Sequence, residues 1–287
     1  YSAAFLRLLI NQEMRRFAMS YTFGFIGVGN MGGALARAAC RWNPRQVVLT
    51  NRSMEKAISL AEELDCDVAM DNATVAREAK FIFLGVKPAG MGQVLAQLAP
   101  VLAQRTDQFV LVSMAAGLQL DRLAQMLGRP APMLRIMPNT PVAIGEGMIL
   151  YTAGPGVDRE DLEEFLIKMD AAGRFDSIDE KLMDAGSSVS GCGPAYVYQF
   201  IEALADGGVE CGLPRAKALE YAAQALAGAA QMVLETGKHP GQLKDEVCSP
   251  GGSTIAGVHA LEEGGLRAAA INAVVKSFEK NKELGKQ

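Results

Sequence analysis

The sequence predicts an α/β protein in which a doubly wound, mainly parallel sheet is followed by an all-α domain. Two observations carry this prediction. Short apolar runs alternate with helix-compatible segments from Tyr21 to about Lys181, and beyond Lys181 only helical patterns recur. Alternating strands and helices are typical of parallel sheets, because each parallel connection needs a crossover. With 287 residues, 49% of them apolar, the chain is long enough for two domains with buried cores.

The predicted strands of the first domain are short, apolar and rich in β-branched or aromatic residues. We expect strands at residues 21–26, 46–50, 81–86 and 109–113, and residues 133–137, 148–151 and 174–178 could extend that sheet. The first strand ends at a glycine turn, and an alanine-rich helix is expected from Ala34 to Cys40. A strand, a turn and a helix therefore open the domain.

The second domain is predicted to consist of helices, including residues 195–210, 215–236 and 266–284. The middle helix is rich in alanine and glycine, which allows a neighbouring helix to approach closely. Packing within one subunit and packing against a partner subunit both explain this composition. A domain of roughly a hundred residues has a modest core, which favours an interlocked homodimer.

Composition excludes several classes of partner. The net charge is −4 and no basic stripe is present, so we expect neither nucleic acid nor a membrane surface as a partner. No apolar run reaches membrane length. The five cysteines include no C-x-x-C pair, which favours a reducing, cytoplasmic location, and two histidines give little support for a metal site. A small-molecule substrate is expected.

The glycine turn after the first strand has the spacing Gly27-x-Gly29-x-x-Gly32. In this pattern the first glycine permits the tight turn, the second lets the backbone approach a pyrophosphate, and the third lets helix and strand pack closely. The phosphates would then bind backbone N–H groups at the helix N-terminus. The sequence predicts a dinucleotide site of the Rossmann type, although a purely structural glycine turn would also follow this pattern.

The end of the second strand indicates which dinucleotide binds. An NAD site would place a carboxylate there, whereas this chain has Asn51-Arg52-Ser53. A guanidinium and two short polar side chains suit the 2′-phosphate of NADP(H), so NADP(H) is preferred, with NAD(H) still open. The alternative is an arginine that is simply solvated in a loop.

Three further strand ends point to the same crevice, because ligands of open α/β sheets collect at the carboxyl ends of the strands. They are residues 85–88, 113–117 and 137–141, where small residues and prolines leave room for the nicotinamide. Each segment is also explained by turn chemistry alone. Lys87 is either a catalytic acid or a lysine that points to solvent.

Taken together, these motifs closely resemble the Δ1-pyrroline-5-carboxylate reductase family. The resemblance runs from about Tyr21 to the C-terminus and is most specific near that end. The motifs that carry it are residues 27–32, 86–88, 137–141, 191–196, 242–245 and 249–254. Three positions depart from the family pattern: Cys192 stands where serine is common, Ser253 where threonine or alanine is common, and Glu246 is variable.

The resemblance implies an NAD(P)H-dependent oxidoreductase that reduces the cyclic imine of Δ1-pyrroline-5-carboxylate to L-proline, the last step of proline biosynthesis. It also implies an α-helical dimerisation domain, often assembled further into decamers. The cofactor contacts that it implies are Ile26, Gly27, Val28, Gly29, Asn30, Met31, Asn51, Arg52, Ser53, Asn72, Gly85, Val86, Lys87, Pro88, Met114, Ala115 and Ala116. The substrate contacts that it implies are Gly251, Gly252, Ser253 and Thr254.

The residues themselves agree with this substrate site. Gly251-Gly252-Ser253-Thr254 precedes helix-compatible residues 255–262, and such a helix start offers free N–H groups and hydroxyls to an anion such as a carboxylate. A plain helix cap is the alternative. Hydride transfer to an imine demands neither a metal nor a Ser-His-Asp array, so positioning is the chief contribution. We expect the Thr254 hydroxyl to bind the ring nitrogen, which makes Thr254 the catalytic candidate.

Two other functions stay open at this point. A β-hydroxyacid dehydrogenase-like oxidoreductase would need a catalytic lysine, and residues 186–193 contain none. A non-enzymatic NADP-binding regulator would bind the cofactor without oxidising it. The predicted organisation is a leader or cloning remnant at residues 1–19, an NADP-binding Rossmann domain at 20–180 and an α-helical substrate and dimerisation domain at 181–287.

Overall fold

The structure is a computed structural model that describes residues 21–284, so the predicted leader at residues 1–19 lies outside it. Contacts divide the chain into two units. Of the described residues, one unit contains 21–191 and 278–284, and the other is Cys192–Ser277. The functional boundary expected between residues 180 and 181 stays a prediction.

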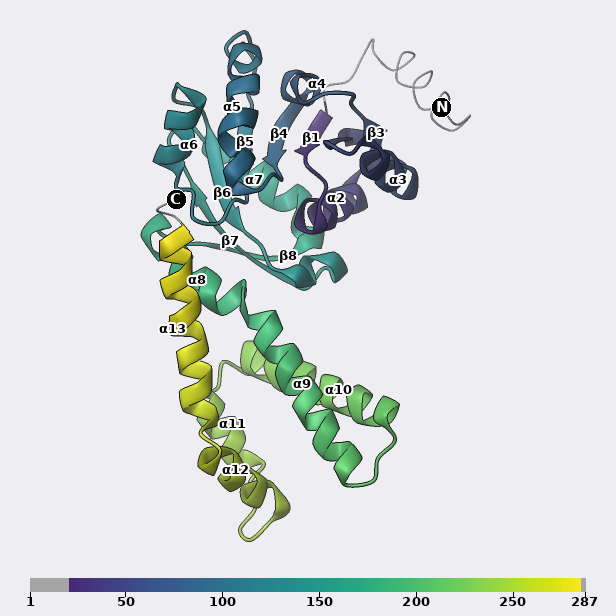
Figure 1. Ribbon diagram of the computed structural model, residues 1–287, viewed down its shortest axis with the longest axis vertical. Helices are drawn as coiled ribbons and strands as arrows, with labels where there is room; N and C mark the ends of the chain where they lie inside the picture. The colour runs from purple at the N-terminus through teal and green to yellow at the C-terminus, as the bar shows by residue number, and fades with distance from the viewer. Residues whose placement is uncertain (1–20, 285–287) are drawn as a thin grey trace. The chain divides into compact units, whose positions relative to one another are not determined.

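Within residues 21–191 the strands form one eight-stranded sheet in the order β3-β2-β1-β4-β5-β6-β7-β8 (Figure 1). Strands β6 and β7 are antiparallel, and the other neighbours are parallel. This confirms the doubly wound, mainly parallel sheet. The strands are β1 (Tyr21–Ile26), β2 (Val47–Thr50), β3 (Asp67–Val68), β4 (Ala79–Leu84), β5 (Val110–Ser113), β6 (Met133–Met137), β7 (Gly147–Ala153) and β8 (Gly173–Ser177).

Helices cover both faces of this sheet, because successive strand residues point to opposite faces and both sets are apolar. Phe23 and Phe25 of β1 face one core, and Ile26 faces the other. The first core is shared with α2 (Asn30–Trp42), α3 (Met54–Leu64) and α7 (Arg159–Lys168). The second core is shared with α4 (Asn72–Glu78), α5 (Pro88–Leu102) and α6 (Leu120–Leu127). The unit also contains α8 (Met183–Ser190).

The predicted boundaries differ from the structure in a few places. The helix after the glycine turn begins at Asn30 and not at Ala34, because Gly32 and Gly33 are helical despite the low helix propensity of glycine. Gln46 lies in a 3-10 turn, and the third predicted strand begins at Ala79 and ends at Leu84. The two-residue strand β3 was not predicted, because so short a run carries no periodicity.

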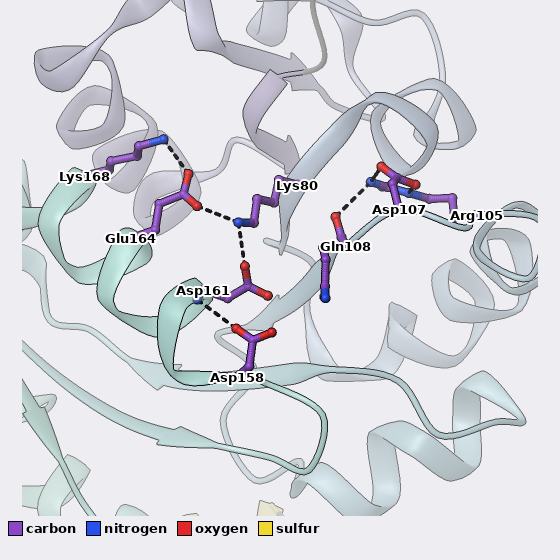
Figure 2. Close-up of polar contacts among 8 residues, drawn as sticks. All are labelled: Lys80, Arg105, Asp107, Gln108, Asp158, Asp161, Glu164 and Lys168. Carbon is purple, nitrogen blue, oxygen red and sulfur yellow. Dashed lines mark hydrogen bonds and ion pairs between the residues drawn. The ribbon is translucent and has the colours of Figure 1, made fainter.

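An ion-pair network joins α7 to the start of β4 at the amino end of the sheet (Figure 2). The Lys80 ammonium contacts the carboxylates of Asp161 and Glu164, and Glu164 also accepts from Lys168. Burial alone would raise the pKa of Glu164, but hydrogen bonds from the two lysines outweigh burial and hold its pKa below the usual range. The network therefore stabilises the folded state while Glu164 is ionised.

We expect Glu164→Gln to lower the free energy of unfolding by about 1 kcal/mol at pH 7, because a partly solvated ion pair contributes little more. Since the folded-state pKa of Glu164 is depressed, its contribution is fully present above about pH 4.3, the ordinary glutamate pKa, and is lost as the pH falls through the folded-state value. Urea denaturation between pH 3 and pH 7 measures this effect. Glu163→Gln, at an exposed neighbour that pairs only with Arg159 among the described residues, is the control. A difference between wild type and Glu164→Gln that is independent of pH would contradict the assignment.

The second unit consists of helices, as predicted. They are α9 (Gly193–Glu210), α10 (Arg215–Thr236), α11 (Pro240–Glu246), α12 (Ser253–Glu263) and most of α13 (Leu266–Leu284). Helix α9 packs against α10, where a Cβ on Gly208 would lie 3.1 Å from the Ala218 side chain. Of residues 192–277, only Ala205, Ala218 and Ala222 are buried.

Large apolar side chains of the second unit are instead exposed. Tyr198 and Tyr221 are more than half exposed, and so are Leu234 and Ile271. A unit of this size that buries only three alanines has almost no core of its own. None of the helices in the described part of the chain combines the length and the apolar character that crossing a bilayer requires.

Candidate functional site

The glycine turn after β1 is packed so closely that two of its glycines admit no side chain. Gly27 has φ +98°, which favours glycine, and its N–H donates to the Thr50 carbonyl at 2.9 Å. A Cβ on Gly32 or on Gly85 would lie 2.2 Å from the Gly27 carbonyl oxygen. A Cβ on Gly29 would meet no described atom within 4 Å, so the turn is open on that side. The roles predicted for the first and third glycines are confirmed.

Helix α2 begins directly behind this turn and presents its N-terminus there. Gly29 is its N-cap in extended conformation, and within residues 21–284 no side chain caps it. The first turn of α2 contains no acidic residue. The first backbone N–H groups of the helix therefore lack intrahelical partners and suit an anion such as a pyrophosphate.

The loop between β2 and α3 contains Asn51, Arg52 and Ser53. The Asn51 side chain accepts from the Val28 N–H at 3.2 Å and donates to the Ser53 carbonyl at 3.0 Å, so it fastens the glycine turn to this loop. Arg52 and Ser53 are exposed, and within the described chain the N-cap Ser53 makes no capping hydrogen bond to α3. Arg52 and Ser53 are thus exposed at the start of α3, whose first turn also contains the acidic Glu55, while Asn51 is engaged internally.

The other predicted cofactor residues follow neighbouring strands. Residues 85–87 form the loop after β4, and Pro88 is the first residue of α5. Lys87, the N-cap of α5, is exposed to solvent. Residues 114–116 follow β5, with Ala115 buried and the N–H of Ala115 donating to the Ser113 hydroxyl at 3.4 Å. Asn72 begins α4 and donates to Gln97 at 3.2 Å.

The segment after β6 has a structural role in this chain. Asn139 is buried, accepts from the Met148 N–H at 2.9 Å and donates to the Ser190 carbonyl at 3.0 Å. Both ends of its amide are therefore used to join β7 and α8. Of the two explanations for residues 137–141, turn chemistry accounts for Asn139.

Because β2, β1, β4 and β5 are adjacent in the sheet, the loops at their carboxyl ends lie along one edge. These loops contain most of the residues predicted to bind the cofactor, and we call them the cofactor half-site (residues 26–31, 51–53, 85–88 and 114–116). The packing role of Gly85 against Gly27 was not predicted. A glycine that directly follows a buried strand beside the glycine turn is the feature that could have indicated it.

The second predicted site lies in the second unit, where residues 251–254 lead into α12; we call these four residues the substrate half-site. Gly251 has φ +68°, and Gly252 is the N-cap, so the helix begins at Ser253, two residues earlier than predicted. A Cβ on Gly252 would lie 2.4 Å from the Ser249 hydroxyl oxygen and 3.1 Å from the Ser249 carbonyl oxygen, so a larger residue would require Ser249 to move. Ser253 and Thr254 are exposed in the first turn, which has no acidic residue.

The substrate half-site therefore offers uncapped N–H groups together with two hydroxyls from adjacent residues. Such an arrangement suits a carboxylate next to a group that accepts a hydrogen bond. Among the described residues, no group of three or more His, Cys, Asp or Glu side chains is placed to hold a metal ion.

Comparison with known families finds one match near the N-terminal end of the described chain and one at its C-terminal end. A family profile described as pyrroline-5-carboxylate reductase dimerisation matches residues 180–284, and one described as NADP oxidoreductase, coenzyme F420-dependent, matches residues 22–117. Pyrroline-5-carboxylate reductase of Escherichia coli is 44% identical over 271 residues, which cover 93% of this chain and 100% of that protein. The enzyme of that name from Pisum sativum is 42% identical over 267 residues, 92% of this chain and 96% of the relative.

Solved structures agree with the sequence comparisons. Plasmodium falciparum pyrroline carboxylate reductase with NADP bound superposes with a TM-score of 0.83 at 33% identity, covering 93% of this chain and 100% of that one. A pyrroline-5-carboxylate reductase from Coxiella burnetii gives a TM-score of 0.84 at 30% identity with the same coverage. The similarity extends through both units.

Proposed function

The chain belongs to the pyrroline-5-carboxylate reductase family and is an oxidoreductase, and from this premise we propose that it reduces Δ1-pyrroline-5-carboxylate to L-proline with NADPH. The observation that carries the proposal is the substrate half-site, which offers a helix N-terminus for an anion and a hydroxyl beside it. The same chain matches an NADP oxidoreductase family in its first unit. The β-hydroxyacid dehydrogenase alternative is not favoured, because residues 186–193 provide no lysine. We further propose that the reaction is the last step of proline biosynthesis and takes place in the cytoplasm.

We expect the purified protein to oxidise NADPH when Δ1-pyrroline-5-carboxylate is added, and not to reduce NADP⁺ when a 3-hydroxy acid is added. The loss or gain of absorbance of the reduced nicotinamide follows both reactions. Activity with the hydroxy acid alone would overturn the proposal. Binding of NADPH without turnover of either substrate would indicate a regulator.

The cofactor half-site fits a dinucleotide on the grounds of its own geometry. The open side of Gly29 and the uncapped start of α2 would hold the pyrophosphate, and residues 85–88 and 114–116 would contact the nicotinamide half. Asn72 is proposed as a further cofactor contact at the start of α4. When bound, the reduced nicotinamide supplies a hydride.

We propose that NADP(H) is preferred over NAD(H). Arg52 and Ser53 are exposed at the start of α3, and the Ser53 hydroxyl makes no capping hydrogen bond to the helix within the described chain. The first backbone N–H groups of a helix also have no intrahelical partners. A 2′-phosphate would form an ion pair with the Arg52 guanidinium and could accept two hydrogen bonds from it, whereas the neutral 2′-hydroxyl of NADH would gain no attraction between opposite charges.

Arg52→Ala is expected to weaken NADPH binding about tenfold or more, since a hydrogen bond to a charged group contributes roughly 1.5–3 kcal/mol. NADH binding should change little. Dissociation constants from nicotinamide fluorescence measure both ligands, with Arg45→Ala as a control at an exposed arginine that pairs with Asp65. Equal losses for NADPH and NADH would remove Arg52 from the 2′-phosphate site.

The substrate half-site is proposed to bind the imino acid through two groups. The N–H groups of Ser253 and Thr254 would hold the carboxylate, since the Gly252 N–H donates to the Ser249 carbonyl, and the Thr254 hydroxyl would hydrogen-bond the ring nitrogen. The reaction adds a hydride to the imine carbon and leaves one proton on nitrogen, so the protein must orient the ring and fix the nitrogen. Gly251 and Gly252 shape the loop so that these groups are free.

We expect Thr254→Ala to lower kcat/KM for Δ1-pyrroline-5-carboxylate about tenfold or more, because a polar contact at the reacting centre is lost. Thr254→Ser keeps the hydroxyl and should retain most of the activity. Steady-state kinetics at saturating NADPH measure both variants. Wild-type kcat/KM in Thr254→Ala would exclude Thr254 from the mechanism.

We propose a homodimer as the smallest assembly, formed through the second unit. Its support is the set of exposed apolar side chains on nearly coreless helices and the match of residues 180–284 to a dimerisation family. A partner copy would supply the apolar contacts that the unit does not make by itself. The decamer implied by the family resemblance is a further stage of the same proposal, and sedimentation velocity measures the size.

A further inference from the structure

A buried arginine interrupts the apolar strand β6. Leu134 and Ile136 point into one core, and between them Arg135 points to the opposite face with only 1% of its surface exposed. Within the described residues, its Nε and Nη2 atoms make no hydrogen bond. Burying a guanidinium is costly unless it is paired, so its partners indicate why it is there.

The principal partner is Glu180, in the 3-10 turn after β8. Arg135 Nη1 lies 3.2 Å from Glu180 Oε1, and Arg135 Nη2 lies 3.6 Å from Asp184 Oδ1 at the start of α8. The same Glu180 oxygen also accepts from the Leu120 N–H at 2.8 Å. One carboxylate oxygen therefore joins the buried guanidinium to the first residue of α6.

Leu120 begins α6, and its N-cap Gln119 offers no side-chain hydrogen bond within the described chain. Glu180 thus does for this helix what an N-cap side chain normally does, and its negative charge suits the positive end of the helix dipole. The loop that ends at Gln119 begins after Ser113, whose register partner on β6 is Arg135 itself. The Ser113 hydroxyl accepts a hydrogen bond from the Ala115 N–H. One hydrogen bond therefore holds the start of this loop, and the bond from Leu120 to Glu180 holds its end.

We propose that Arg135 and Glu180 are positioning residues for the cofactor: they hold the β5–α6 loop, and with it residues 114–116, in the conformation that receives the nicotinamide half. This rests on the proposed assignment of residues 114–116 to the cofactor. A buried ion pair contributes little net stability compared with apolar residues of similar size, so stability alone does not account for it. Its geometric result is a fixed loop beside the cofactor half-site.

The test separates the two halves of the cofactor. Binding of NADPH and of adenosine 2′,5′-bisphosphate, which lacks the nicotinamide half, is measured by calorimetry without Δ1-pyrroline-5-carboxylate. Glu180→Ala should raise the dissociation constant of NADPH about tenfold and change the dissociation constant of the bisphosphate by no more than about twofold. Glu180→Gln keeps an oxygen that can accept from Leu120 and should retain NADPH affinity within about threefold. Lys181→Ala, at the exposed neighbour that pairs with Asp179, is the matched control.

A second variant keeps the test decisive if Glu180→Ala folds poorly. Glu180→Asp preserves the charge beside Arg135 but is one methylene too short to reach both partners, so it should weaken NADPH in the same direction. Unchanged NADPH affinity, equal loss of both ligands, or equal loss in Glu180→Gln and Glu180→Ala would each overturn the proposal. Arg52→Ala should weaken binding of the bisphosphate. This result would show that the bisphosphate occupies the proposed 2′-phosphate site. Because no substrate is present, failure of the proposed reductase activity leaves the result interpretable.

Discussion

The contact on which the first unit depends is the backbone packing around the Gly27 carbonyl. The start of α2 and the loop after β4 both approach this oxygen so closely that a single methyl group on either would overlap it. Hydrogen bonds from Gly27 to β2 and from Gly85 to β1 complete the same junction. Three strand ends and one helix start are thereby fixed at one point, and the cofactor half-site is the surface of that junction.

Much of the polar side-chain chemistry in the first unit stabilises the protein and is not available to ligands. The amides of Asn51 and Asn139 are engaged at both ends, and each joins segments that are distant in sequence. Among the described residues of the first unit, the starts of α2 and α3 have no side-chain cap, and the Arg52 and Ser53 side chains are exposed beside them. A site of this kind binds and orients its ligands, which agrees with a reaction in which the cofactor supplies the chemistry.

The two units differ in how much apolar side-chain surface they bury. The sheet buries aromatic side chains in its own core, where the rings of Phe25 and Phe83 stack at 4.3 Å. The helices of the second unit bury only alanines and expose many of their large apolar residues. The small residues along α10 fit this arrangement, because small side chains permit another helix to approach closely. The second unit is, in this respect, built for association.

The sequence by itself determined the fold class and most strand and helix positions, because periodicity is a local property. Glycine spacing is local too, and it located the two motifs that are proposed to bind ligands. The sequence even placed the limits of β1, β6, α10 and α13 correctly. It did not reveal that Asn51 is engaged internally, that Gly85 packs against Gly27, or that Glu180 both pairs with an arginine in an apolar strand and accepts from the first N–H of α6. These contacts join residues 23 to 60 positions apart, and only the folded sheet brings such residues within bonding distance.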